Sequence, residues 1–278
     1  MKDNKKINNS IEEITKQLEE GVKEVFTSEN YLNYLKVMSK FYNYSFNNCL
    51  LIAMQMPEAT LIAGYQTWKN KFNRQVKKGE KAIRILAPIP HKFKKEIEKE
   101  DGSKEEKEIK YTTFRAVSVF DISQTDGEEL PKIAQKLQGS LEQYEKLLEE
   151  LKSISPVNIY FEEIKSEANG YYSPSDDKIV IRKDLSQQHT IKTLIHEIAH
   201  AILHSEDGEE TEADLNTKEV QAESIAYTVC QYLGLDTSDY SFGYVAGWSK
   251  GKEVKELQAS MEIIRTTSKE IIEQLRTD

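Results

Sequence analysis

The sequence is poor in cysteine and lacks any long apolar run. Its two cysteines, Cys49 and Cys230, lie far apart in apolar surroundings and at no metal-ligand spacing, which predicts reduced core residues rather than a disulfide. No run of about 18 apolar residues occurs, and the opening MKDNKKINNS contains no apolar segment of the signal-peptide kind. We therefore expect a cytoplasmic protein with no membrane partner.

What is present is the composition of a folded protein. A chain of 278 residues suits one large domain or two ordinary ones. A hydrophobic content of 38%, with 14 Tyr and 9 Phe, argues against wholesale disorder. The formal net charge of -9 would exclude nucleic acid as a partner if the charge were uniform, because phosphates repel an acidic surface.

The charge is not uniform. Residues 1–130 hold 22 Lys and Arg against 20 Asp and Glu, whereas residues 131–278 hold 16 against 27. Between Tyr65 and Lys95 there are ten cations and a single acid, Glu80. The net charge is therefore an average over a basic segment and an acidic half, and a nucleic-acid partner stays possible.

The apolar pattern predicts an α+β protein of two domains, at residues 1–135 and 136–278. In the first domain we expect helices at 11–25, after a capping box of Ser10 and Glu13, at 29–39 and around 50–53, then strands at 81–86 and 112–120 with a solvated hairpin extension at 96–110. In the second we expect helices at 141–152, 186–204, 217–233 and 252–275, and strands at 157–161 and 178–181 on either side of a turn-rich segment.

One of these helices carries the motif His196-Glu197-Ile198-Ala199-His200. The i, i+4 spacing places both imidazoles on one face, about 5 to 6 Å apart, where they can hold one metal ion. Glu197 occupies the position that zinc hydrolases use for a general base. The alternative is an ordinary amphipathic helix with two surface histidines.

A third ligand has to come from outside this motif. His204 lies about 12 Å along the helix axis from His196, which is too far to share the ion. We therefore expect it to cap the helix or to support a metal ligand without binding the ion itself. Glu219 and Glu223 share one face of the next predicted helix, with Ala222 leaving room for close approach. Glu219 could instead be a capping-box residue that answers Asn216.

The spacing of these residues resembles the gluzincin pattern. That resemblance implies that Glu219 is the third zinc ligand, that Glu223 orients a ligating histidine, and that Glu197 takes a proton from a zinc-bound water that attacks a peptide carbonyl. It also assigns Lys178–Arg182 as the strand that aligns an extended substrate. Zn2+ is the expected cofactor, and other divalent metals fit the same ligands.

The basic segment mixes cations with Tyr65, Trp68 and Phe72, a combination that suits single-stranded nucleic acid. The alternative is a solvated basic face whose Trp68 and Phe72 belong to the core. Three ordered stretches, YSFNNCLLIAMQMPEATLIAGYQTW, RQVKKGEKAIRILAP and VFDISQTDGEELP, resemble the N-terminal single-stranded-DNA-binding domain of ArdC-type antirestriction proteins. That family adds a C-terminal zincin-like metallopeptidase domain with HEIAHAILH and an E-x-x-A-E helix, so the resemblance covers nearly the whole chain.

The resemblance implies a protein of conjugative or integrative mobile elements that protects transferred DNA from restriction. It assigns DNA contact to Ser45, Phe46, Asn47, Asn48, Trp68, Lys69, Arg74, Lys77, Lys78 and Lys81. Asn73 and Ala82 stand where the family pattern has glycines; Asn tolerates the left-handed conformation, whereas Ala82 argues against close backbone approach to a phosphate.

Three functions remain open at this stage. The first is a single-stranded-DNA-binding metallopeptidase-like protein. The second is a zinc peptidase whose basic segment binds a protein partner. The third is a non-catalytic DNA-binding protein with a structural metal.

Overall fold

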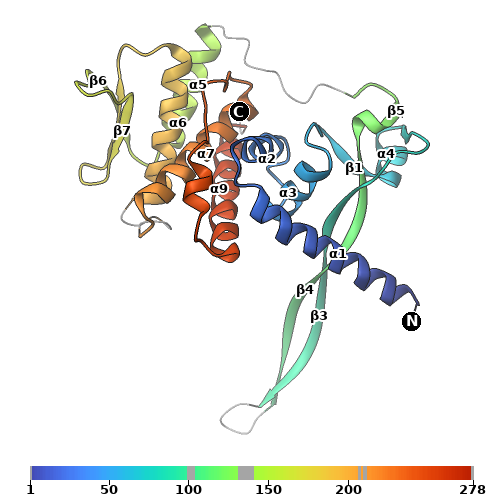
Figure 1. Ribbon diagram of the computed structural model, residues 1–278. Helices are drawn as coiled ribbons and strands as arrows, with labels where there is room; N and C mark the ends of the chain where they lie inside the picture. The colour runs from blue at the N-terminus through green and yellow to red at the C-terminus, as the bar shows by residue number, and fades with distance from the viewer. Residues whose placement is uncertain (1, 99–103, 131–140, 206–207, 209–211, 277–278) are drawn as a thin grey trace.

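The computed structural model describes residues 2–98, 104–130, 141–205, 208 and 212–276 (Figure 1). The chain opens with three helices, α1 (Lys2–Glu24), α2 (Ser28–Lys40) and α3 (Phe46–Gln55). The expected start of the first helix at Ser10 is wrong, because α1 already begins at Lys2. No Pro or Gly lies between Lys2 and Ser10 to interrupt the helix, so the local capping signal is overridden.

A small β-layer follows the helices. It contains β1 (Ile62–Gly64), α4 (Tyr65–Lys71), β2 (Arg74–Val76), β3 (Ile83–Glu98), β4 (Lys104–Asp121), the 3-10 helix η1 (Ile122–Gln124) and β5 (Thr125–Gly127). The strands form a sheet in the order β1-β4-β3 and a separate pair, β2-β5. Asn73 has a φ of 50°, so it keeps the left-handed turn that the sequence suggested.

The expected strands at 81–86 and 112–120 are present but extend much further. β3 and β4 pair without a break from Ile83↔Val119 to Glu98↔Lys104 and project from the body as a twisted two-stranded ribbon (Figure 1). The expected hairpin extension at 96–110 is therefore largely strand, and its residues 99–103 lie outside the described part of the chain.

The second half is built around another three-stranded sheet. Its elements are α5 (Leu141–Ile154), β6 (Asn158–Glu162), β7 (Gly170–Ser173), β8 (Lys178–Arg182), α6 (Gln187–His204), α7 (Leu215–Leu233), α8 (Val245–Ser249) and α9 (Val254–Gln274). Strand β7 lies inside the segment expected to be turn. The turn itself is confined to Pro174–Asp177, and Tyr171 and Tyr172 favour strand.

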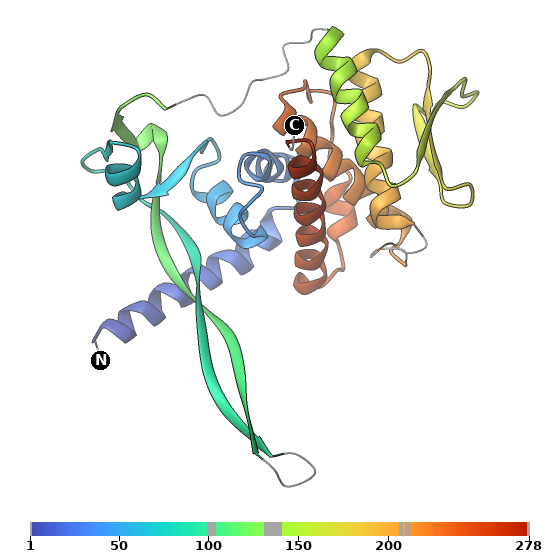
Figure 2. The same ribbon diagram turned by 180° about the vertical axis from the view of Figure 1, so that it is seen from behind.

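The two halves share one continuous hydrophobic core, in which α2 packs on α7 and both α1 and α3 contact α9 (Figure 2). At this junction the Tyr31 hydroxyl lies 2.8 Å from Ser224 Oγ, and the ring centroids of Phe26 and Trp248 are 5.6 Å apart. Cys49 and Cys230 are both free and buried, as the sequence predicts. The expected domain division at 135/136 lies outside the described residues. Within those residues, none of the helices is both long and apolar enough to cross a membrane.

Candidate metal centre and nucleic-acid surface

Helix α6 begins where the sequence places it. The Ser186 side chain caps the helix by accepting a hydrogen bond from the His189 backbone N–H at 3.3 Å. Ile195, Ile198 and Ala199 are fully buried, which leaves the two motif histidines on the face directed toward α7. The apolar side of the amphipathic helix therefore fixes the direction in which the two candidate ligands point.

Helix α7 presents the third ligand candidate. Its N-cap is Asp214, which accepts a hydrogen bond from the Thr217 backbone N–H at 3.0 Å. Asn216 therefore lies inside the helix, and the alternative in which Glu219 completes a capping box with Asn216 is wrong. Ala222 is fully buried, as a small residue at a close helix contact should be.

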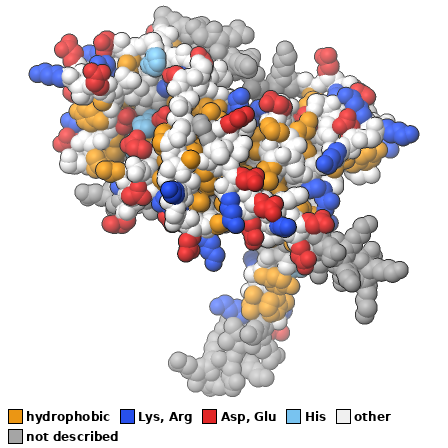
Figure 3. Space-filling view, in the orientation of Figure 1, with side chains coloured by type: hydrophobic (Ala, Val, Ile, Leu, Met, Phe, Trp, Pro, Cys, Tyr) orange, Lys and Arg blue, Asp and Glu red, His pale blue; other side chains and the backbone are white. Residues whose placement is uncertain are grey.

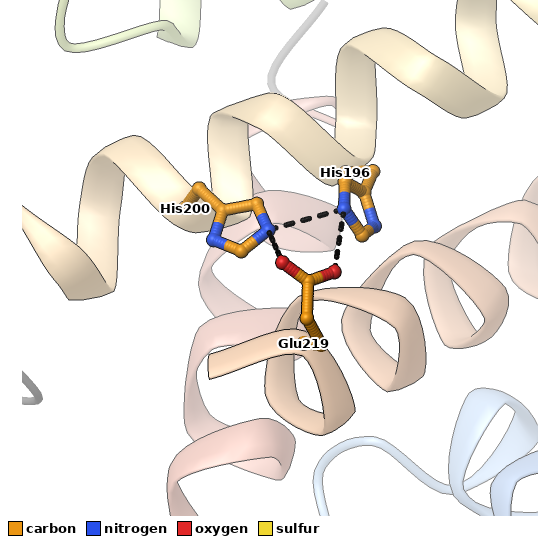
Figure 4. A group of neighbouring side chains, drawn as sticks. All are labelled: His196, His200 and Glu219. Carbon is orange, nitrogen blue, oxygen red and sulfur yellow. Dashed lines mark hydrogen bonds and ion pairs between the residues drawn. The ribbon is translucent and has the colours of Figure 1, made fainter. Parts of the chain in front are cut away.

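His196, His200 and Glu219 converge on one point between α6 and α7 (Figure 4). Their nearest ligand atoms all lie within 4.8 Å of one another. The two Nε2 atoms are 3.1 Å apart, and the Glu219 carboxylate oxygens lie 3.7 Å from His196 Nε2 and 3.5 Å from His200 Nε2. Two imidazoles and a carboxylate form a donor set suited to a divalent transition metal.

Glu223 supports one of the histidines from the other side. Its Oε2 lies 3.2 Å from His196 Nδ1, so it does not face the point where the other three side chains meet. A carboxylate at this position favours the proton on Nδ1 and leaves the Nε2 lone pair directed at the cluster. The geometry therefore separates the two acids of α7 into a candidate ligand and a candidate orienting residue.

His204 supports His200 through a chain of hydrogen bonds, the relay from His200 through His204 to Gln221. Gln221 Nε2 donates to Ser260 Oγ at 3.2 Å, so its Oε1 accepts from His204 Nε2 at 3.0 Å. His204 Nδ1 then accepts from His200 Nδ1 at 2.9 Å. This chain of donors leaves the lone pair of His200 on Nε2, toward Glu219.

The electrostatics of the cluster follow from burial and its carboxylates. Burial lowers the pKa of His204 to about 4, so this imidazole is neutral, as the relay requires. Burial also opposes the charged form of His196, but Glu223 and the other nearby carboxylates outweigh it and raise its pKa. The hydrogen bond to His200 lowers the pKa of Glu219, which keeps that carboxylate ionised.

Glu197 points away from α7 toward the sheet. Burial raises the pKa of its carboxyl group, although His196, His200 and a hydrogen bond from the Tyr172 backbone N–H work in the opposite direction. A carboxylate with a raised pKa is a better proton acceptor near neutral pH. The Tyr172 contact means that strand β7 itself positions Glu197.

Two cavities border the cluster, and Glu223 lines both of them. One of about 340 Å³ is lined by Gly170, Thr193, His196 and Glu197, and one of about 570 Å³ by Glu219, Glu223, Tyr244 and Trp248. The cluster is therefore reachable from solvent rather than sealed in the core.

The edge strand beside this site differs from the expected one. Strand β8 (Lys178–Arg182) is central in the order β6-β8-β7, with both of its edges hydrogen-bonded, so it has no free edge for an extended substrate. The expectation for Lys178–Arg182 is wrong for this reason. β7 is the edge strand next to Glu197.

Several of the residues expected to contact DNA are buried or hydrogen-bonded within the protein. Phe46 and Trp68 are buried, and the Trp68 indole N–H donates to the Phe120 carbonyl at 2.8 Å. The buried Asn48 amide makes two 2.9 Å hydrogen bonds to the Leu86 backbone. The Arg74 guanidinium is tied to Thr125, Gly127 and Glu128. Asn48, Trp68 and Arg74 thus hydrogen-bond to the backbone of the β-strands or beside them, and the Phe46 ring packs against Tyr34. The assignment of these four side chains to DNA contact stays a prediction.

The remaining candidates lie on the surface. Ser45 caps α3 by accepting from the Asn48 backbone N–H at 3.4 Å, and Asn47 is half-buried beside it. Lys69, Lys78 and Lys81 are exposed, and Lys77 donates to the Ser123 carbonyl at 2.9 Å while keeping part of its side chain in solvent. A row of exposed lysines therefore persists where the sequence shows its basic segment.

Comparison with known families matches both halves of the chain. Residues 4–120 match the "N-terminal domain of anti-restriction factor ArdC", and residues 110–227 match the "Putative metallopeptidase family (DUF6782)". Crystal structures of the antirestriction ArdC protein from the R388 plasmid, one metal-free and one Mn(II)-bound, have the same fold. They are 23% and 21% identical to this chain, each with a TM-score of 0.51 and coverage of 83% of both chains. The chain therefore combines a domain of the ArdC N-terminal kind with a domain of a putative metallopeptidase family, and its fold is of the ArdC type.

The α+β, two-domain fold class predicted for this ArdC-type chain is confirmed. A Bacillus anthracis protein, "Uncharacterized protein pXO2-81/BXB0111/GBAA_pXO2_0111", is 30% identical over 310 residues. The alignment includes 96% of this chain but 52% of that protein, so the ArdC-type chain spans about half the length of the curated relative it matches.

Sequence reasoning missed two features of the ArdC-type site. One is Gln221, a fully buried amide among apolar neighbours on α7, whose burial signals a specific hydrogen-bond partner. The other is the Tyr172 backbone contact to Glu197, for which the tyrosine-rich segment before the turn offered a weak strand signal.

Proposed function

We propose that this chain is an antirestriction protein of mobile elements that binds single-stranded DNA through its N-terminal domain and hydrolyses peptide bonds with its C-terminal domain. The observation that carries the proposal is the convergence of His196, His200 and Glu219 beside Glu197. Zinc is the proposed ion, held by these three ligands, and manganese fits the same donor set.

The donor chemistry supports a catalytic rather than a structural ion. Structural zinc sites are closed by four protein ligands, whereas three ligands leave a coordination position open. The two cavities that border the cluster would provide access to that position. The non-catalytic alternative, with a metal that only stabilises the fold, is less consistent with this openness.

When bound, the ion supplies Lewis-acid activation of a water molecule and of the substrate carbonyl. Glu197, which lines the smaller cavity, takes the proton from the attacking water and delivers it to the leaving amine. Strand β7 (Gly170–Ser173) lies at the edge of its sheet, where an extended peptide would pair with it, and Tyr172 in the same strand keeps Glu197 in place. Substrate alignment and proton transfer would thus depend on one short strand.

The DNA-binding part of the proposal is supported by exposed lysines. Lys69, Lys78 and Lys81 are exposed on a half of the chain with little net charge, and Lys77 keeps part of its side chain in solvent although its ammonium group contacts Ser123 and Asp126. Binding through several phosphate contacts releases counterions, so affinity for an oligonucleotide should fall steeply as salt rises. Binding that is absent, or independent of salt, would argue against DNA as the partner.

The peptidase part is tested with Glu197→Gln. The zinc-loaded variant should retain one bound ion but lose cleavage of a mixed peptide library, because the amide cannot accept the proton. Native mass spectrometry measures the ion and chromatography of the library measures cleavage. Cleavage by the variant at the wild-type rate would contradict the mechanism, and a wild-type protein that binds zinc but cleaves nothing would favour the non-catalytic alternative.

A further inference from the structure

The most conspicuous feature outside these sites is the ribbon of β3 and β4. Hydrophobic side chains gather on the part of the ribbon that projects below the body (Figure 3). Phe93 and Tyr111 keep 46% and 49% of their surface exposed, although the centroids of their two rings lie only 5.9 Å apart. Large exposed aromatic side chains clustered in this way mark a binding surface rather than a core.

These rings share one face of the ribbon. The pairs His91↔Tyr111 and Phe93↔Ile109 are directly opposite in the ladder, so their four side chains point the same way. His91 stacks on Tyr111 at 4.8 Å with 14° between the ring planes, and its Nε2 lies 2.7 Å from Thr113 Oγ1. The face is therefore an ordered platform of flat rings.

The charges divide between the two faces. Lys92, Lys94 and Lys110 lie on the opposite face, where they pair with Glu106 and Glu108 at 2.8 to 3.8 Å. Lys107 and Arg115 lie on the aromatic face, one on either side of Tyr111 along β4, and both are exposed. Glu105 has a register position on the same face, opposite Ile97, toward the tip of the ribbon and beyond Lys107.

We propose that the aromatic face of the β3–β4 ribbon is a second binding site for single-stranded nucleic acid. Unstacked bases would lie on Phe93 and Tyr111, and the phosphates between them would meet Lys107 and Arg115. Glu106 and Glu108 lie on the far face and are paired with lysines, which reduces the repulsion that a phosphate backbone would encounter on the aromatic face. This proposal rests on the DNA binding proposed above and adds a contact surface separate from the lysines near Lys77.

The test compares three variants of the full chain. A fluorescent oligothymidylate of roughly 30 nucleotides, longer than the footprint of one small site, is titrated and its anisotropy is followed. The double variant Phe93→Ala, Tyr111→Ala should bind about tenfold or more weakly, because it removes two stacking platforms. Phe114→Ala is the matched control, since Phe114 is 53% exposed on the same strand but on the opposite face, and its affinity should equal that of the wild type.

The third variant separates the two DNA proposals. Lys77→Gln, Lys78→Gln should weaken binding and reduce its salt dependence while leaving the ribbon intact. If this variant loses affinity and the ribbon double variant does not, the ribbon proposal fails and the proposed function stands. If the wild type binds no oligonucleotide, both fail.

A direct contact is measured with the same oligonucleotide carrying 5-bromodeoxyuridine. Irradiation should produce crosslinks that map by mass spectrometry to Phe93 or Tyr111. Crosslinks confined to Phe114 and the far face would overturn the proposal. So would a ribbon double variant that binds DNA normally but no longer self-associates in sedimentation experiments, because the face would then be an interface between copies of the chain.

Discussion

The imidazoles of His200 and His204 lie 2.9 Å apart, Nδ1 to Nδ1. Two imidazoles can share this contact only if one nitrogen carries the proton and the other does not. Because His204 Nε2 carries a proton and donates it in a hydrogen bond to Gln221 Oε1, His204 Nδ1 carries none, and the proton between the two rings belongs to His200. His204, which is too distant to bind the proposed ion, can therefore orient His200, a proposed ligand.

The first prediction concerns this relay. Gln221→Leu removes the acceptor for His204 and should lower metal affinity about 10- to 100-fold, as loss of an outer hydrogen-bond partner does at other metal sites. Gln221→Glu keeps an acceptor oxygen and should restore most of the affinity. Competition with a chelator measures the affinity, and thermal unfolding of the metal-free variants controls for stability. Equal affinity for the leucine variant and the wild type would assign Gln221 to packing alone.

The second prediction separates the two acids of α7. Glu219→Ala removes a proposed ligand, whereas Glu223→Ala removes a group that contacts only His196 Nδ1. We expect Glu223→Ala to lower metal affinity about 10- to 100-fold and Glu219→Ala to lower it further. Isothermal titration with zinc measures both. The reverse order would make Glu223 the ligand.

The third prediction concerns the contact between β7 and α6. A Cβ added at Gly170 would lie 2.7 Å from Thr193 Cγ2 and 3.0 Å from both Ile181 Cδ1 and the Val180 carbonyl oxygen. Gly170→Ala should therefore push the edge strand away from α6 and destabilise the protein by about 1 to 3 kcal/mol. Denaturant unfolding measures the loss, and peptide cleavage should fall because Tyr172 no longer positions Glu197.

Two further variants check the cause. Thr193→Ser removes the nearest clashing atom and should partly rescue Gly170→Ala. Gly247→Ala is the matched control, because nothing lies within 4 Å of a Cβ there, and it should leave stability unchanged or raise it by up to about 1 kcal/mol. Equal effects at the two glycines would contradict the steric explanation.

The fourth prediction concerns Asp121, which ties the ends of β1 and β4 together. Its buried carboxylate accepts backbone hydrogen bonds from Thr60 at 2.7 Å, Leu61 at 3.0 Å and Ser123 at 2.9 Å. Burial alone would raise its pKa, but these hydrogen bonds outweigh burial and lower it. The group therefore contributes stability above its unfolded pKa of about 3.9, and this contribution is lost as pH falls through the lower folded value.

Asp121→Asn should cost about 1 to 3 kcal/mol at neutral pH, because an amide nitrogen replaces an oxygen that accepts backbone hydrogen bonds. The difference between variant and wild type should shrink as the pH falls below about 4, toward and through the lowered pKa of the folded protein. Denaturant unfolding across this range measures it. A difference that stays constant with pH would show that the charge of Asp121 does not contribute.

The sequence by itself determined the features that depend on residues close together in the chain. The i, i+4 separation of His196 and His200 places both imidazoles on one helix face wherever α6 packs, and the Ser186 cap and the basic run around Lys77 are equally local. Only the tertiary structure decided that Glu219 meets the histidines while Glu223 supports one of them, that Trp68 is buried, and that β7 rather than β8 is the edge strand. These outcomes depend on how segments distant in the chain pack together, because a rotation or shift of one helix changes which of two neighbouring side chains reaches its partner.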